Sequence, residues 1–458
     1  FLVVFQGQVL AAQQETASGD EEIMAAADRL SLGLRERFGD TFNNLRRTEP
    51  LERVTTGSHQ ALRLFGQGLQ AWNQGDNTRA MQLLEESIAL DTTFAMAYRK
   101  LAIILQNHME RRSRAVEAAT KAYQYRGRLT ERERYLVTAA YHSVVTGDRD
   151  QVISAYRTVL DIYPDDHYAL NNLGVIYSAL REYERAGEYY ARALAVDSAT
   201  RLHFSNLAIA LENQEKFDSA AMILERFEAR FPNNPEVGIG WIYLAVMQKD
   251  YVATEELGRA LIAAQRGTVY WEATAYEWMA NLDAMRGRMA SANERWQRAL
   301  ELNAGRGLRG QYLLRTARRA ITESQLLDDG GGGRRILDDA LARFPLDSLS
   351  PLDRPYAQLA MAYAAVGDGA HARSLVEEYE NTPEADHSKL TELWKHGALG
   401  IADLKEGRLE DALVQFRLFD EGDSCNTCAL PWMAQTFDQA GKADSARVLY
   451  EQFAETPS

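Results

Sequence analysis

The chain has 458 residues, with 51 Lys and Arg against 65 Asp and Glu, and its formal net charge at pH 7 is −14. This acidic balance argues against a function in which basic side chains coat nucleic-acid phosphates. A hydrophobic fraction of 46% with only 10 prolines is typical of a folded, helix-rich chain, and no apolar run approaches the ~20 residues of a membrane helix.

The N-terminal residues 1–15 are rich in β-forming side chains, and both faces of the run Phe1–Phe5 are apolar. This pattern predicts a buried strand. No other segment offers a second strand, so we expect its backbone to pair with another chain or with a domain absent from the sequence. Residues 1–15 are therefore predicted to be an assembly arm, with Phe1, Val3, Phe5 and Val9 as its contact residues.

Residues 16–58 are predicted to hold a leading helix and a linker. Ile23, Ala27, Leu30 and Leu34 recur at helical spacing within residues 21–38. Residues 59–303 then form an N-terminal repeat block, and residues 336–458 form a C-terminal one. Between them, residues 304–335 are expected to be a degenerate repeat whose Asp328–Gly333 segment, with four consecutive glycines, is a flexible loop.

A period of about 34 residues organises both blocks. Small residues recur where two antiparallel helices would cross closely, and bulky ones recur where neighbouring pairs would meet. The predicted core positions are Leu173, Gly174, Tyr177, Ala186 and Tyr190, followed one period later by Leu207, Ala208, Ala220 and Leu224. This is the tetratricopeptide pattern, and it predicts an all-α superhelical solenoid of about eleven helix pairs.

Glycines mark the predicted turns within these pairs. Gly75, Gly147, Gly367 and Gly407 lie between the two predicted helices of their pairs, where a left-handed residue ends the first helix.

Several segments resemble the C-terminal, non-kinase repeat region of some bacterial serine/threonine protein kinases. The resemblance implies an interaction module preceded by a small β-containing segment, of which residues 1–15 would be the last strand. The chain departs from that family in lacking a Gly-rich phosphate loop, a His-Arg-Asp motif and an Asp-Phe-Gly motif, so no kinase activity is carried over. The segments are Asp28–Ser31, Leu34–Arg37, Pro50–Thr56, Ala61–Leu64, Phe94–Leu101 and Leu129–Leu136.

No catalytic, cofactor or metal constellation is indicated. Gly305–Gly310 matches a dinucleotide fingerprint in letters, but it follows a helix and lacks a βαβ unit. The aspartate pairs at 165–166 and 328–329 lack the alternating ligands of a calcium loop. No zinc-type spacing links the histidines, which are His59, His108, His142, His167, His203, His371, His387 and His396. We expect neither a cofactor nor a metal.

Cys425 and Cys428 form a CxxC motif at the start of the last repeat. A redox site would need an α/β fold, and half a zinc site would need two more cysteines. A local disulfide is the favoured interpretation, with two buried thiols as the alternative.

The off-pattern aromatic residues Trp72, Trp271, Trp278 and Trp394 are candidates for a contact surface.

Two function classes follow. The favoured one is a structural subunit that polymerises with copies of itself through its N-terminal strand and solenoid ends. The other is a monomeric module that binds a peptide or partner protein. An enzyme ranks third, because no constellation supports one. The start at Phe1 rather than Met fits a processed or truncated chain and, with the CxxC motif, favours an extracytoplasmic or cell-surface setting over a cytoplasmic one.

Overall fold

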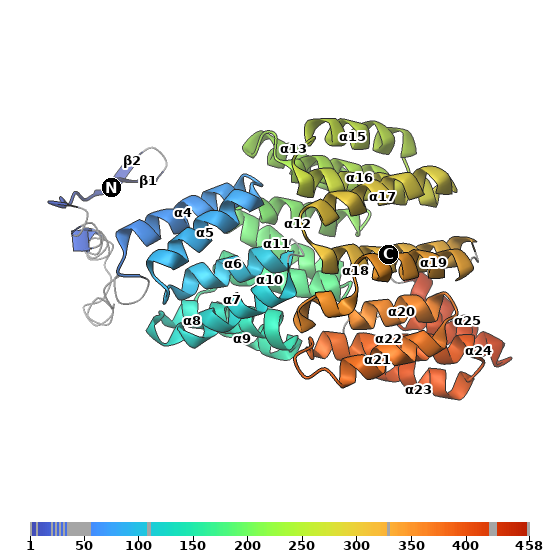
Figure 1. Cartoon of the computed structure of the whole chain (residues 1–458). Coiled ribbons are helices and arrows are strands. Elements are labelled where there is room, and N and C mark those ends of the chain that lie inside the picture. Colours follow the sequence, from blue (N-terminus) through green and yellow to red (C-terminus); the bar gives the residue numbers. More distant parts are fainter. Residues whose placement is uncertain are drawn as a thin grey trace. The chain divides into compact units, whose positions relative to one another are not determined.

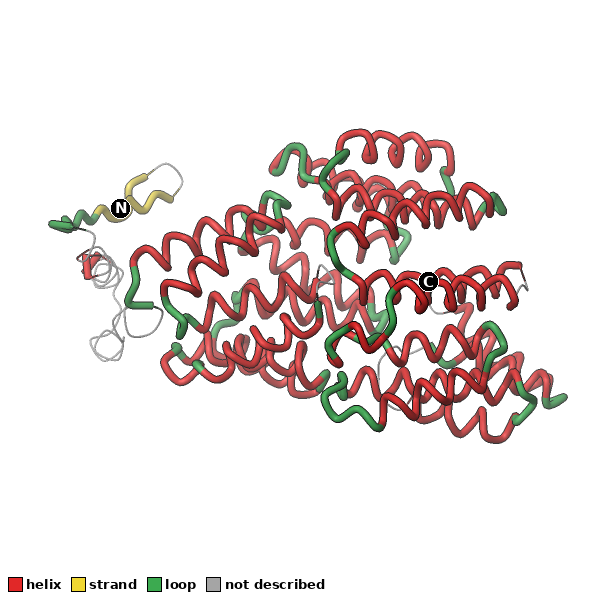
Figure 2. The backbone as a smooth tube through the Cα atoms, in the orientation of Figure 1, coloured by secondary structure: helices red, strands yellow, loops and turns green. Residues whose placement is uncertain are grey.

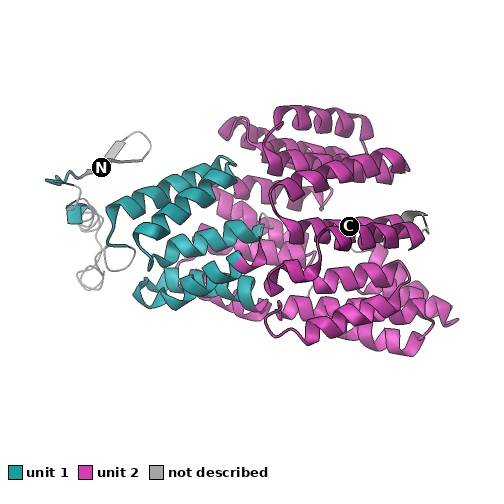
Figure 3. Cartoon of the chain, in the orientation of Figure 1, with its two compact units in different colours: residues 1–108, 114–145 teal, residues 109–113, 146–458 magenta. Residues whose placement is uncertain are grey.

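The computed structural model describes residues 2–5, 8–19, 56–107, 111–327, 330–420 and 428–455, together with isolated residues between 22 and 33 (Figure 1). The chain forms two compact units, residues 1–108 with 114–145 and residues 109–113 with 146–458 (Figure 3). Helices dominate the described part (Figure 2). No described helix is both long and apolar enough to cross a lipid bilayer.

The first unit contains one hairpin followed by helices. Its elements are β1 (Leu2–Phe5), β2 (Gln8–Ala12), α4 (His59–Asn73), α5 (Asn77–Leu90), α6 (Ala95–Asn107), most of α7 (Arg112–Gln124), the 3₁₀ turn η2 (Arg126–Arg128), α8 (Glu131–Tyr141) and most of the π-helical turn η3 (His142–Thr146).

The second unit is entirely helical in its described part. Its α-helices are α9 (Arg149–Ile162), α10 (His167–Ala179), α11 (Tyr183–Val196), α12 (Arg201–Glu212), α13 (Phe217–Arg230), α14 (Pro235–Met247), α15 (Tyr251–Ala264), α16 (Val269–Met285), α17 (Met289–Gly305), α18 (Arg309–Leu327), α19 (Gly330–Arg343), α20 (Tyr356–Ala365), α21 (Gly369–Glu380), α22 (Lys389–Lys405), α23 (Leu409–Asp420), α24 (Leu430–Gln439) and α25 (Ala443–Glu455). The 3₁₀ turns η4 (Leu346–Ser348) and η5 (Pro351–Asp353) precede α20.

The described helices from α4 to α25 follow one another as eleven pairs in sequence order. The two helices of a pair pack on each other in α4–α5 of the first unit and in the pairs from α10–α11 to α24–α25 of the second. The all-helical solenoid predicted from the repeat period is confirmed. The two segments whose sequence pattern is weakest, around α14–α15 and α18–α19, also form helix pairs.

The prediction of one N-terminal strand without a partner in its own chain is wrong. β1 pairs with β2 as an antiparallel hairpin, with Leu2 opposite Ala12 and Phe5 opposite Gln8, and a bulge shifts the register between Val3 and Val4. The β-forming run is long enough to supply two short strands, of four and five residues, that pair with each other. Phe1 and the strand side chains lie outside the described residues, as does most of the predicted leading helix and linker.

The prediction of a flexible loop at the glycine run is also wrong for Gly330–Gly333. Gly330–Gly333 form the first turn of α19. A Cβ at Gly330 would lie 2.5 Å from the carbonyl oxygen of Val366, and one at Gly333 would lie 2.7 Å from a Val366 methyl group. The glycines therefore let α19 approach the end of α20 closely, and this packing outweighs their poor helix propensity. Asp328 and Asp329 lie outside the described residues.

The predicted left-handed turns are present. Gly75, Gly147, Gly367 and Gly407 have φ values of 85°, 64°, 87° and 77°. The residue after the glycine begins the second helix of the pair as its N-cap in three of these turns: Asp76, Asp148 and Asp368 each accept a hydrogen bond from the backbone three residues on.

Glycine occupies the point where the two helices of a pair approach each other most closely. A Cβ at Gly174 of α10 would lie 2.6 Å from the ring of Tyr190 in α11, and a Cβ at Gly400 of α22 would lie 2.6 Å from the ring of Phe416 in α23. In both pairs the glycine and the ring stand at the same separation along the chain. The aromatic ring occupies the space that a side chain on the facing helix would otherwise fill, so the backbones can approach.

We expect Gly174→Ala to lower the free energy of unfolding by about 1–3 kcal/mol, because the added methyl group overpacks against Tyr190. Urea denaturation followed by circular dichroism measures the change. The matched control is Gly305→Ala at the end of α17, where the added Cβ meets open space. This control is expected to be neutral or to stabilise by up to about 1 kcal/mol. Equal stability of the two variants would contradict the proposed close crossing.

Candidate functional site

The first helices of consecutive pairs pack on each other in two stretches of the second unit. α10 packs on α12, α12 on α14, α18 on α20, and α20 on α22. Side chains on these helices that do not point at a partner helix are therefore presented together, at intervals of one repeat.

Two exposed aliphatic side chains lie in the first of these stretches. Val175 of α10 and Ile209 of α12 lie one repeat period apart and are 44% and 38% exposed, respectively. Their immediate neighbours, Gly174 and Ala208, are buried at the helix crossings. Because one residue step rotates a helix by about 100°, the residue after the buried position points away from the partner helix. The same period that buries one position thus exposes the next.

Amide side chains bridge the same helices. Asn206 donates a hydrogen bond of 3.0 Å to the Oδ1 of Asn171, joining α12 to α10. Asn213 donates one of 3.2 Å to the Tyr243 hydroxyl, joining α12 to α14. Asn206 and Asn213 lie three residues before and four residues after Ile209, so they share its helix face. We call Asn171, Val175, Asn206, Ile209, Asn213 and Tyr243 the repeat face.

A buried carboxylate lies next to the repeat face. Glu212 is fully buried, and neither of its side-chain oxygens has a hydrogen-bond partner in the described part of the chain. Burial raises the pKa of Glu212 to about 8, so the group is largely protonated at neutral pH. The pKa of Tyr243 is raised as well, first by burial and further by the charge of Glu212.

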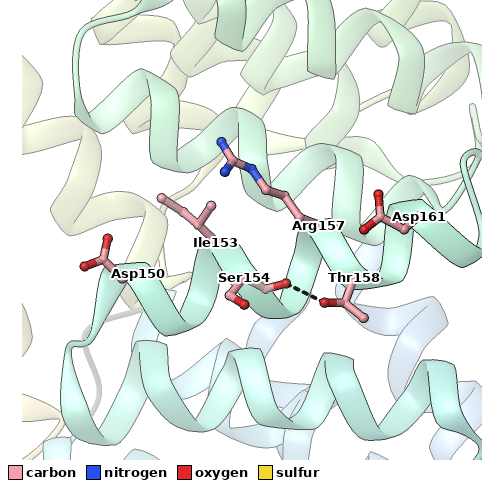
Figure 4. Close-up of a pocket in the computed structure, with 6 residues that line it drawn as sticks. All are labelled: Asp150, Ile153, Ser154, Arg157, Thr158 and Asp161. Atoms are coloured by element: carbon pink, nitrogen blue, oxygen red, sulfur yellow. Dashed lines mark hydrogen bonds between the residues drawn. The ribbon is translucent and has the colours of Figure 1, made fainter.

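A separate hollow of 590 Å³ lies along α9, lined by Asp150, Ile153, Ser154, Arg157, Thr158 and Asp161 (Figure 4). Arg157 donates a hydrogen bond of 3.0 Å to the Tyr177 hydroxyl, and Thr158 donates one of 2.9 Å to the Ser154 carbonyl. All six lining residues belong to the single helix α9, whereas the residues described above come from α10, α12 and α14. We therefore take the repeat face as the candidate site.

All nine predicted core positions are buried. Of the aromatic residues predicted to form a contact surface, Trp72 and Trp271 are only 4% and 5% exposed, so that prediction is wrong for both. The Trp72 ring lies under the ammonium group of Lys100, 3.0 Å from the ring centroid. Trp278 and Trp394 are half-buried against core residues.

Cys428 is disulfide-bonded, whereas Cys425 lies outside the described residues. The pairing of these two cysteines, and the extracytoplasmic setting inferred in part from it, stay predictions.

The structure also brings His167 and His203 beside Asp197, a cluster that the sequence spacing does not indicate. Sequence reasoning misses the repeat face as well, although the aliphatic residues one period apart at positions 175 and 209 carry a signal for it.

Known proteins support the repeat assignment. A sequence model described as tetratricopeptide repeat matches residues 155–188. The chain carries tetratricopeptide repeats. Its resemblance to the kinase-linked repeat region in particular stays a prediction.

Anaphase-promoting complex subunit 3 of Schizosaccharomyces pombe (strain 972 / ATCC 24843) is 23% identical over 228 residues, which are 47% of this chain and 33% of that protein. The chain thus spans about a third of the length of this curated relative.

Two solved structures are similar at low identity. The APC/C hetero-tetramer Cut9-Hcn1 is 13% identical with a TM-score of 0.43, and the match covers 95% of this chain and 84% of that one. A tetratricopeptide repeat protein from Parabacteroides merdae ATCC 43184 is 15% identical with a TM-score of 0.36, covering 54% and 94%.

The raised pKa of Glu212 predicts a pH dependence of stability. An unfolded carboxyl group releases its proton near pH 4.5, whereas the folded one holds it up to about pH 8. Between these values the folded state binds more protons, so its stability falls as pH rises and levels off above about pH 8. We expect Glu212→Gln to remove this pH dependence. The free energy of unfolding of the variant, taken relative to that of the wild type, should therefore rise from pH 5 to pH 8.

Urea denaturation midpoints across that range measure the difference. The matched control is Glu225→Gln, at an exposed position of the neighbouring helix α13. A Glu212→Gln profile parallel to that of the wild type would show that the carboxyl group is not held protonated.

Proposed function

We propose that the chain is a non-catalytic interaction scaffold that binds an extended segment of a partner protein along the repeat face. The observation that supports this most is the recurrence of an exposed aliphatic side chain at Val175 and Ile209, beside the amides that bridge the same helices. Apolar contacts supply affinity, and amide groups can pair with a peptide backbone in either direction.

The repeat spacing constrains the segment. Neighbouring helices pack about 8–10 Å apart, and a polyproline II segment advances about 9 Å every three residues. A segment with an apolar residue at every third position would therefore place one such residue over Val175 and the next over Ile209. The net charge of −14 favours neutral or basic segments over acidic ones.

We expect peptides selected from a display library against the wild-type chain to bind at the repeat face. For such peptides, Val175→Asp and Ile209→Asp are each expected to weaken binding about tenfold or more, because each buries a charge against an apolar side chain. Fluorescence anisotropy measures the dissociation constants. The control is Val252→Asp. Val252 is 68% exposed and lies on α15, the second helix of its pair, whereas Val175 and Ile209 lie on first helices.

Unchanged affinity in both repeat-face variants, or an equal loss in the control, would contradict binding at this face.

Self-assembly is the second candidate function. The β1–β2 hairpin satisfies one ladder of backbone groups, but a two-stranded sheet keeps two outer edges, and either edge could accept a strand from another copy. Such head-to-tail contacts would propagate into open polymers unless they closed into a ring. The strands pair with each other, so their backbone groups need a second chain less than the sequence indicates. The argument for self-assembly is weaker for that reason.

Negative-stain electron microscopy of the full chain and of a variant lacking residues 1–12 separates the two functions. Partner binding predicts single particles for both proteins. Polymers that form only when residues 1–12 are present would instead support assembly through the hairpin.

A further inference from the structure

Two histidines and an aspartate from three consecutive elements meet next to the repeat face. His167 is the first residue of α10, Asp197 is the C-cap of α11, and His203 is in the first turn of α12. One potential ligand atom from each lies within 4.8 Å of the others. The stacking of one repeat on the next is what brings them together.

The spacing fits coordination of a single ion. The Nδ1 of His167 lies 3.2 Å from the Oδ2 of Asp197. Two ligands bound to one tetrahedral Zn²⁺ at about 2.0–2.1 Å lie about 3.3 Å apart. This pair therefore already has the edge length of such a site.

The His203 ring presents its other nitrogen as a ligand. Its Nδ1 lies 2.9 Å from the backbone carbonyl of Asp197, which can only accept, so Nδ1 carries the proton and Nε2 keeps its lone pair. This arrangement is how proteins orient metal-binding histidines. His203 is buried, with 1% of its surface exposed.

Asp197 is held in place as a carboxylate. Its Oδ1 accepts a hydrogen bond of 2.8 Å from the backbone of Ala199, and its Oδ2 accepts one of 2.7 Å from the hydroxyl of Thr200. These bonds offset the cost of burying the carboxylate and fix its orientation. Each carboxylate oxygen has two lone pairs, so Oδ2 retains one for an ion.

The turn itself does not require the histidines. Asp91, the C-cap of α5, builds the same kind of turn by accepting hydrogen bonds from the backbone of Thr93 at 2.9 Å and from the hydroxyl of Thr56 at 2.6 Å. Ala61 and Ala97 stand at the same offsets from Asp91 as His167 and His203 do from Asp197. His167 and His203 are thus additions to a turn that the chain can form without them.

We propose that His167, Asp197 and His203 form a binding site for a divalent transition-metal ion of the Zn²⁺ class. Two imidazoles and one carboxylate are a common ligand set for such ions. The side chains of His167 and Asp197 are 20% and 23% exposed, so water can reach the fourth position. A bound ion would fasten α10, the α11–α12 turn and α12 to one another beside the repeat face.

Isothermal titration of the untagged full chain with ZnCl₂ tests the proposal. We expect one ion per chain, and we expect His167→Gln and Asp197→Asn each to lower the affinity about tenfold or more. Both substitutions are close in size and affect partly exposed side chains, so the fold is retained. Binding to the native state alone also predicts a Zn²⁺-dependent rise in thermal midpoint, which the two variants lose.

His387→Gln is the matched control, because the Nδ1 of His387 also lies 3.2 Å from a carboxylate oxygen, that of Glu392. Among the described residues, this pair is not part of a three-ligand cluster. This variant is expected to bind Zn²⁺ like the wild type. Titration of the wild type with Co²⁺ gives an independent readout, since a tetrahedral site produces intense visible absorption. No saturable binding, or an affinity unchanged in both site variants, would overturn the proposal.

Discussion

The close crossing of the two helices within a pair, seen in α10–α11 and α22–α23, is the constraint on which the rest of the structure depends. Where Gly174 faces Tyr190 and Gly400 faces Phe416, the space on one helix is filled by a ring from the other. This exchange of volume fixes which side of each helix is buried. The remaining sides of each helix stack on the next pair or face solvent. Exposed positions therefore recur with the same period as buried ones.

The period also controls the backbone between helices. Gly147, Arg181, Glu215 and Lys249 follow one another at intervals of one repeat, and their φ values are 64°, 61°, 58° and 59°. Only the first is glycine; the other three adopt the left-handed conformation despite its cost. Packing of the helices on either side therefore overrides local preference at these turns, and the repeat face and the histidine cluster both lie among these pairs.

The sequence predicts the features that depend on spacing within one repeat: the helix pairs, their number and the glycine turns. It fails where the deciding contact lies outside the repeat. The helix at Gly330–Gly333 exists because of Val366, which no local pattern reveals. The metal-ligand cluster joins side chains from separate elements across two loops, so no motif spacing identifies it. The N-terminal run resembles one strand because apolar, β-forming residues are common in both of the segments that pair as β1 and β2.

The central claim is that the repeat face on α10, α12 and α14 holds an extended partner segment. Photo-crosslinking tests it most directly, using a selected peptide that carries a benzophenone group and mass spectrometry to locate the attachment. The account predicts attachment on α10, α12 and α14, around Val175, Ile209 and Tyr243. Attachment confined to the β1–β2 hairpin, or to the hollow along α9, would contradict it.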